Sequence, residues 1–273
     1  MLIKKQKSKG ERRAVASDGW PDTSDGISIN IYGRSGTGKT TLWATFPGPI
    51  LCLVCSGGKR PGELRSVDTP EYRKKITPKV VTSADALRRE LEDARDYDTV
   101  VLDHASGLQD LLLKEVLGID ELPAQRSWGM ATQGDWGQCA LMTKEVLRAI
   151  LSLRCNRVIV AQEREFNADS ESRLLMPYVA SATTPSVVGW LNPACDYIVR
   201  TVLRKKTVER KVKIGNKIRV RQVETDEMEY ALQVGPDDVF TTKFRRPRGG
   251  AALPNFVVDP DYGKIMELIR GGS

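Results

Sequence analysis

The sequence has few of the residues from which metal and redox sites are built. It contains one histidine and five cysteines among 273 residues. Cys52 and Cys55 have C-x-x-C spacing in "CLVC", but no second such pair and no histidine cluster follows them. Alternation along a strand would also place the two thiols on opposite faces. We therefore expect structural cysteines in a reducing cytoplasm, without metal or redox chemistry.

Long apolar runs, internal repeats and low-complexity segments are also absent. No run is long enough to span a membrane, and the lysine-rich start lacks the apolar centre of a signal peptide. We therefore expect a soluble protein that is not exported. Residues 1–25 combine clustered Lys and Arg with little apolar periodicity, which predicts a disordered basic tail.

The charge balance is moderately basic. Lys+Arg number 42 against 35 Asp+Glu, which gives a formal net charge of +7 and a pI near 9.1. Such an excess suggests a polyanionic partner, and taken alone it favours nucleic acid only weakly.

The hydrophobic pattern predicts an α/β fold around one substantial core. Short runs rich in Val and Ile alternate with helical segments, which is typical of a mainly parallel sheet covered on both faces. After Asp196 the period changes to two, with Gly215-Asn216 as a turn signal, so an antiparallel extension should follow. We expect an ATPase-type core over 26–205, then a hairpin extension and a C-terminal helix packed on the core over 206–273. The predicted strands of the core are 27–32, 50–55, 99–103 and 157–162. The segments with period two are 196–206, 209–223, which contains the Gly215-Asn216 turn signal, and 229–234. One predicted helix starts at 38, and the others are 84–95, 108–117, 136–154 and a short helix within 259–272.

The stretch "GRSGTGKTT" carries the strongest chemical signal. It matches G-x-x-x-x-G-K-[ST] after a predicted strand and before a predicted helix. Glycines let successive N–H groups surround phosphate oxygens, the lysine reaches the β- and γ-phosphates, and the next threonine places a hydroxyl group on Mg²⁺. An ordinary glycine-rich turn is the competing interpretation. The predicted nucleotide-binding residues are Gly33, Arg34, Ser35, Gly36, Thr37, Gly38, Lys39, Thr40 and Thr41.

Three further polar residues are candidates for the same site. Asp103 ends the strand "TVVLD" and could hold the hydration shell of a Mg²⁺ ion together with Thr40; otherwise it caps the next helix. Glu63 could orient the attacking water, or be a surface residue of a flexible loop. Gln162, at the end of "RVIVAQ", could sense the γ-phosphate, or be a simple strand-terminal polar residue. His104, the single histidine, is expected only to hydrogen-bond beside Asp103.

In order of parts, the chain resembles the RecA-like ATPases of bacteriophages, specifically compact phage recombinases and single-strand annealing ATPases. The P-loop, Asp103, Gln162, a polar loop, the antiparallel extension and then "TTKFRRPRGG" and "LPNFVVDPDYGKI" carry this resemblance over about 26–270. It implies that Gln162 couples ATP to a DNA-contacting loop over 163–186. It also implies that Lys243 with Arg245 or Arg246 reaches a neighbouring subunit's phosphates. In that family the catalytic glutamate usually lies at the end of the second strand, where this chain has "CSGGKR".

The predicted hairpin is rich in cations. Nine Lys or Arg lie between Arg204 and Arg221, interleaved with Val and Ile at strand spacing, which predicts a basic face and an apolar face. Lysines that guard a sheet edge would explain the same pattern. Trp128 could stack on a base or pack against the core. The predicted DNA-binding residues are Lys211, Lys213, Arg219 and Arg221.

The resulting hypothesis is an ATP- and Mg²⁺-dependent ATPase, stimulated by single-stranded DNA, that acts in phage recombination or strand annealing. Its partners would be single-stranded DNA, further copies of itself and a single-strand-binding protein, with no membrane, in the cytoplasm of an infected bacterial host. The alternatives are a phage replication or helicase-loading ATPase, a small-metabolite P-loop kinase, and a binding module that holds ATP as a structural ligand.

Overall fold

A computed structural model of the chain describes residues 26–55, 62–119, 131–167, 177–214 and 217–272. Its described part is organised around one 10-stranded sheet. The strands are β1 (Ser28–Gly33), β2 (Ile50–Val54), β3 (Ile76–Val80), β4 (Thr99–Asp103), β5 (Asn156–Phe166), β6 (Tyr178–Ser181), β7 (Tyr197–Ile214), β8 (Lys217–Gln233), β9 (Lys243–Phe244) and β10 (Phe256–Val258).

The strand order is β10-β8-β7-β1-β5-β4-β2-β3, and β6 and β9 pair with β5 and β7 beside this path. The run from β3 to β7 is parallel, whereas β8, β10, β6 and β9 pair antiparallel to their neighbours. The predicted α/β class with an antiparallel extension is confirmed.

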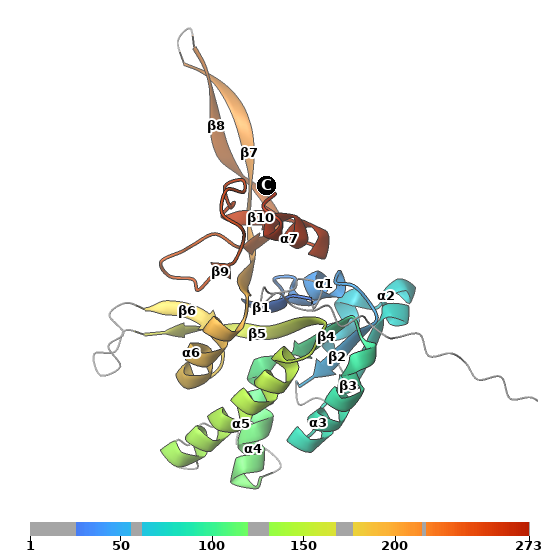
Figure 1. Cartoon of the computed structure of the whole chain (residues 1–273). Helices are drawn as coiled ribbons and strands as arrows, with labels where there is room; N and C mark the ends of the chain where they lie inside the picture. Colours follow the sequence, from blue (N-terminus) through green and yellow to red (C-terminus); the bar gives the residue numbers. More distant parts are fainter. Residues whose placement is uncertain (1–25, 56–61, 120–130, 168–176, 215–216, 273) are drawn as a thin grey trace, which may run out of the picture.

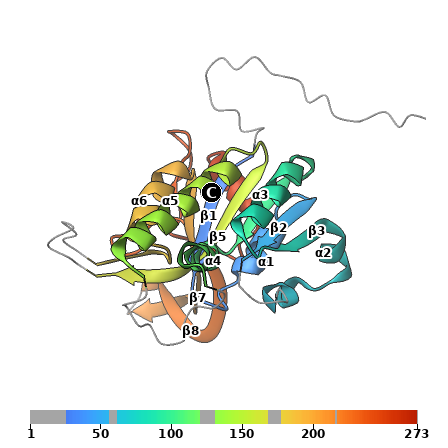
Figure 2. The same cartoon turned by 90° about the horizontal axis from the view of Figure 1, so that it is seen from below.

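Helices cover both faces of the sheet, as Figures 1 and 2 show. One face packs against α3, α4, α5 and α6 through Leu87, Leu108, Leu147 and Leu191. The other packs against α1 and α7 through Leu42 and Ile265. The helices are α1 (Lys39–Ala44), α2 (Pro70–Lys75), α3 (Ala84–Glu92), α4 (Ala105–Leu117), α5 (Gln133–Leu151), α6 (Pro185–Ala194) and α7 (Tyr262–Ile269), with 3₁₀ turns η2 (Gly62–Val67) and η3 (Asp93–Asp96).

All five cysteines are buried, and none of them forms a disulfide. Cys52 lies in the core on the α1 side of the sheet and Cys55 in the core on the α4 side, as the strand alternation predicted. Among the described helices, none has the length and apolarity needed to cross a membrane.

The segment after Gln162 differs from the expected polar loop. β5 continues to Phe166 and pairs with β6, and helix α6 follows. Phe166 and Tyr178 stack at 4.8 Å between ring centroids, so this hairpin has a small apolar core of its own. β3 and α2 were also missed. β3 is an edge strand with one buried residue, Ile76, and a proline, and α2 has no buried residue, so neither shows a clear hydrophobic pattern.

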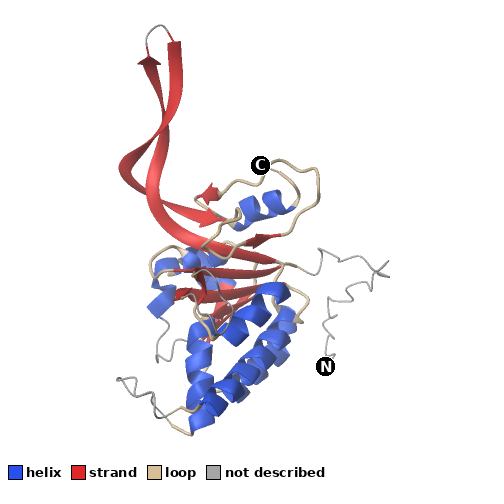
Figure 3. Ribbon diagram, turned by 90° about the vertical axis from the view of Figure 1, so that its left-hand side faces the viewer, coloured by secondary structure: helices blue, strands red, loops and turns tan. Residues whose placement is uncertain are grey.

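The β7–β8 hairpin extends well beyond the body of the sheet (Figures 1 and 3). The expected boundary at 205/206 falls inside the continuous strand β7, at a register shift between Lys205 and Thr207. The division into domains stays a prediction. The C-terminal helix α7 does pack on the core, where Tyr262 contacts Phe46 of the segment after α1 at 4.8 Å between ring centroids.

The register contradicts the single basic face predicted for the hairpin. Lys211 pairs with Val220 and Lys213 with Ile218, whereas Arg219 pairs with Val212 and Arg221 with Arg210. Cross-strand partners share a face, so the two lysines and the two arginines occupy opposite faces. Ile214 pairs with Lys217, so odd-numbered positions of β7 pair with even-numbered positions of β8. This register already follows from the predicted turn at Gly215-Asn216, so the single basic face was an error in applying the pattern.

Candidate nucleotide-binding site

The P-loop connects the end of β1 to the start of α1. Gly36 and Gly38 have φ values of 79° and 88°, in the left-handed region that glycine adopts without strain. A Cβ atom on Gly33 would lie 2.4 Å from Oγ1 of Thr201, because β7 passes directly beside the loop. Glycine is therefore required here by backbone conformation and by close approach.

Lys39 is buried inside this turn. Its Nζ donates to the carbonyl oxygens of Gly33 at 2.8 Å and Arg34 at 2.7 Å, and to Oε1 of Gln162 at 3.2 Å. Burial lowers the pKa of Lys39, and the carboxylates of Asp103 and Glu163 oppose that shift. The loop thus closes around its own ammonium group, at the place where phosphate oxygens would otherwise supply the acceptors.

Gln162 reaches Lys39 because β5 lies between β1 and β4. Gln162 pairs with Gly33 in the register, and Asp103 ends the next strand, β4. The carboxyl ends of parallel strands meet at one sheet edge, so the three predicted groups converge there. Their positions agree with the sequence analysis, while their roles stay predictions.

Asp103 is almost fully buried, and Nε1 of Trp43 donates to its Oδ2 at 3.2 Å. Burial raises the pKa of Asp103, and His104 and the Trp43 hydrogen bond act in the opposite direction. Thr40 precedes Trp43 by three residues on α1, so it lies on the same helix face. The helix-cap interpretation is not supported, because His104 caps α4 through Nδ1, which accepts from the Gly107 N–H at 2.9 Å.

Glu63 lies in η2, close enough to Asp103 for its charge to raise the pKa of that carboxyl group. Its Oε2 is buried without a hydrogen-bond partner among the described residues. A hydroxyl group at Thr40 and the Asp103 carboxylate are hard donors that suit Mg²⁺, which keeps several of its waters. The described residues hold no group of three His, Cys, Asp or Glu side chains that could bind a metal unaided. Such a set fits a cation that also takes ligands from water and phosphates.

We expect Glu63→Gln to preserve ATP binding and to lower turnover by about 100-fold, because general-base assistance contributes on that scale. ATP affinity and steady-state hydrolysis, measured on the same preparation, separate the two effects. Glu71→Gln is the matched control, since Glu71 is an exposed acidic residue in the first turn of α2. Loss of ATP affinity in Glu63→Gln would instead make Glu63 a structural residue of its segment.

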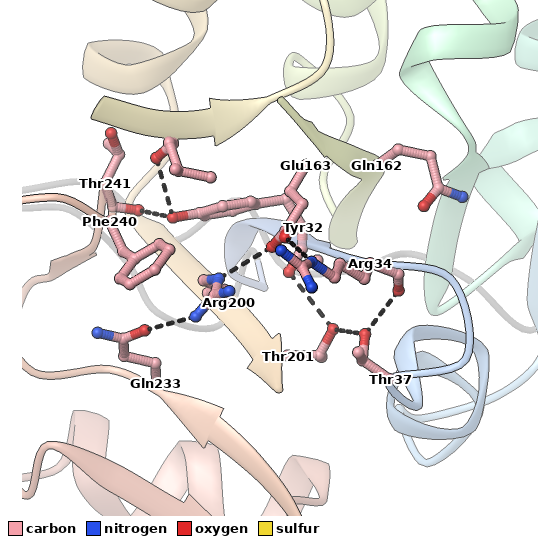
Figure 4. A network of polar contacts seen from close by, with 12 residues as sticks. Tyr32, Arg34, Thr37, Gln162, Glu163, Arg200, Thr201, Gln233, Phe240 and Thr241 are labelled. Atoms are coloured by element: carbon pink, nitrogen blue, oxygen red, sulfur yellow. Dashed lines mark hydrogen bonds and ion pairs between the residues drawn. The ribbon is translucent and has the colours of Figure 1, made fainter. Parts of the chain in front are cut away.

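Glu163 was not predicted, and it bridges the P-loop to β7 (Figure 4). Its Oε1 accepts from Nε of Arg34 at 2.7 Å and its Oε2 from Nε of Arg200 at 3.0 Å. Arg200 also lies over the ring of Phe240, 3.6 Å from its centroid. Thr37 and Thr201 share a further hydrogen bond of 2.7 Å. The nucleotide loop is therefore connected to the root of the hairpin by an ion-pair bridge and by a hydroxyl pair.

Tyr32 adds a second connection, from the residue before the P-loop. Its hydroxyl group lies 2.9 Å from the carbonyl oxygen of Thr241 and 3.3 Å from that of Val179, within hydrogen-bonding distance of both (Figure 4). Burial raises the pKa of Tyr32. Tyr32 lies in the core on the α4 side of the sheet. No sequence signal identified the carbonyl groups near its hydroxyl.

The basic residues proposed to act on a neighbouring subunit lie near the amino ends of β1 and β7, at the opposite end of these strands from the P-loop. Arg245 forms an ion pair with Asp196 at 2.8 Å, and the Asp196 N–H donates to Ser28 at the start of β1. Five residues of strand, roughly 17 Å, separate Ser28 from the P-loop. Lys243 donates to three carbonyl oxygens at the end of α6, and Nη1 of Arg246 is buried without a partner among the described residues.

Of the predicted DNA-binding residues, Arg221 is exposed on β8. Lys211, Lys213 and Arg219 lie on the two hairpin strands. The predicted turn Gly215-Asn216, the basic tail and Trp128 lie outside the described residues.

A family model described as an AAA domain matches residues 25–245. No curated protein matches the sequence. The solved structures similar to this chain include the flagellar accessory protein FlaH from Methanocaldococcus jannaschii, with 10% identity, a TM-score of 0.41, and 88% of this chain and 89% of that chain covered. They also include a KaiC-like protein from Pyrococcus horikoshii, with 13% identity, a TM-score of 0.37, and 86% and 89% covered.

Proposed function

Because this chain belongs to the AAA domain family, we propose that it is an ATPase whose activity depends on single-stranded DNA, of the kind used in phage recombination or strand annealing. Membership of this family makes it an ATP-binding P-loop ATPase. What we propose beyond this is that the ATPase acts on single-stranded DNA, and that ATP binding and DNA binding influence each other.

The nucleotide roles follow from the converging side chains. Lys39 exchanges the carbonyl oxygens of Gly33 and Arg34 for phosphate oxygens. Thr40 and Asp103 would hold a Mg²⁺ ion, which would supply positive charge to neutralise the phosphates. Glu63 orients the attacking water. Gln162 then loses its contact with Lys39, so nucleotide binding changes the start of the β5–β6 hairpin.

The observation that carries the DNA assignment is the connection between the P-loop and the cation-rich hairpin. Thr201 and Arg200 belong to β7, the strand that continues into the extended β7–β8 hairpin, which we call the arm. Thr201 shares a hydrogen bond with Thr37 of the P-loop, and Arg200 is linked to Arg34 of the P-loop through Glu163. An arm with cations on both faces can contact successive phosphates of a flexible single strand. A small-metabolite kinase would have no use for this arm.

Arg245 and Arg246 are too far from the P-loop of their own chain, so their proposed phosphate contacts require a neighbouring copy of the chain. This role depends on oligomerisation, and the ion pair between Arg245 and Asp196 would have to open in the assembly.

The direct test is ATP turnover with and without single-stranded DNA, and we expect clear stimulation. We also expect DNA affinity to fall steeply with salt, because each neutralised phosphate contributes roughly 0.7 to the log–log slope. Replacing Lys211, Lys213, Arg219 and Arg221 with glutamine should reduce that slope by up to about 3 and leave DNA-free turnover unchanged. Fluorescence anisotropy over a salt series measures the slope.

The matched control removes the same charge elsewhere. Lys74, Arg89, Arg95 and Arg154 are exposed on or near the helices of the body, so their replacement with glutamine alters net charge equally but spares the arm. Equal log–log salt slopes of DNA affinity in the two quadruple variants would show that the hairpin cations serve only to prevent edge-to-edge strand pairing.

A further inference from the structure

An exposed apolar patch covers one face of the hairpin root. Leu203, Met228 and Tyr230 are 43%, 53% and 49% exposed, which is unusual for large apolar side chains on a sheet. Leu203 pairs with Tyr230, and Lys205 pairs with Met228 one step farther along. Because cross-strand partners share a face, the three apolar side chains form one continuous surface. We call it the root platform.

The opposite face of the same strands is already covered. Arg204 pairs with Glu229 in an ion pair of 2.8 Å, and its guanidinium lies 4.5 Å from the centroid of the Phe256 ring. The hairpin root therefore has one satisfied face and one open apolar face.

The root platform adjoins the P-loop. A Cβ atom on Gly38 would lie 3.3 Å from Cδ1 of Tyr230, so the tyrosine ring sits directly beside the N-cap residue that precedes α1. Thr201, two residues before Leu203 on the same face, shares its hydroxyl hydrogen bond with Thr37. Two residues of strand span about 7 Å, which is the step from the phosphate loop to the platform.

We propose that the root platform is the nucleobase subsite of the nucleotide-binding site, with Tyr230 stacking on the base and Leu203 and Met228 flanking it. This deepens the proposed function and rests on it. A nucleotide with its phosphates at the start of α1 has an apolar, π-faced base that must lie near the loop, and the platform supplies a matching aromatic surface there. Stacking tolerates different bases, but a two-ring purine covers more of the platform than a pyrimidine.

The test compares ATP with inorganic tripolyphosphate, which has the phosphates but no base. Calorimetry on the full chain would measure both ligands with the wild type, Tyr230→Ala, Tyr230→Phe and Lys39→Ala. We expect Tyr230→Ala to weaken ATP binding by about tenfold and to leave tripolyphosphate binding unchanged, whereas Tyr230→Phe keeps wild-type affinity for both. The preference of the wild type for ATP over CTP should shrink in Tyr230→Ala.

Leu141→Ala is the matched control, because Leu141 is a 68% exposed apolar residue on α5, away from the P-loop. Unchanged ATP affinity in Tyr230→Ala, or equal weakening of ATP and tripolyphosphate, overturns the base subsite. The second result would make Tyr230 a support for the Gly38 turn. If the wild type binds neither ligand, the nucleotide site itself is refuted, and Lys39→Ala identifies any binding of tripolyphosphate outside the P-loop.

Discussion

Lys39→Ala should abolish measurable ATP hydrolysis, with kcat lower by about a thousandfold, and should sharply weaken ATP binding. The ammonium group is the cation buried within the phosphate loop, and three acceptors hold it there. Its removal takes away both the charge that attracts the β- and γ-phosphates and the group that stabilises charge in the transition state. Steady-state hydrolysis and calorimetric ATP binding measure the two losses.

The matched control is Lys75→Ala. Nζ of Lys75 also donates to a backbone carbonyl oxygen of α1, that of Ala44 at 2.9 Å, but at the end of the helix that faces away from the P-loop. We expect this variant to turn over ATP at the wild-type rate. Circular dichroism and thermal unfolding of both variants confirm that the fold is kept. Near-wild-type turnover in Lys39→Ala would refute the nucleotide assignment of the loop.

Asp103→Asn should leave ATP binding within a few-fold of the wild type and lower turnover by at least about 100-fold, because the amide keeps the shape but loses the charge that holds a metal hydration shell. The asparagine can still accept the Trp43 hydrogen bond through Oδ1, so the local geometry survives. Turnover should be measured over a Mg²⁺ titration, since a weakened metal site shows a higher Mg²⁺ requirement.

Trp43→Phe separates orientation from charge, because it removes the indole donor to Oδ2 of Asp103 and keeps an aromatic ring in the core. We expect a smaller loss of turnover than in Asp103→Asn, with a partial shift in the Mg²⁺ requirement. Full activity of Asp103→Asn at saturating Mg²⁺ would show that the carboxylate serves only the packing at the end of β4.

The sequence by itself determined the nucleotide loop, the α/β class and the residues that end the strands at the site edge. These features are local. Gly36 and Gly38 are needed for a left-handed turn, and strand and helix periodicity can be recognised within a few residues. Parallel strands then bring Asp103 and Gln162 to one edge whatever the details of packing.

The tertiary structure decided everything that depends on strand order and register. Arg34 and Glu163 are 129 positions apart, and their ion pair exists because β5 was placed beside β1. The pairing of β7 with β1 also set Tyr230 of β8 against Gly38. Local propensity specifies what each segment becomes, but contacts between distant segments are chosen by the packing of the whole sheet, and no short pattern encodes that choice.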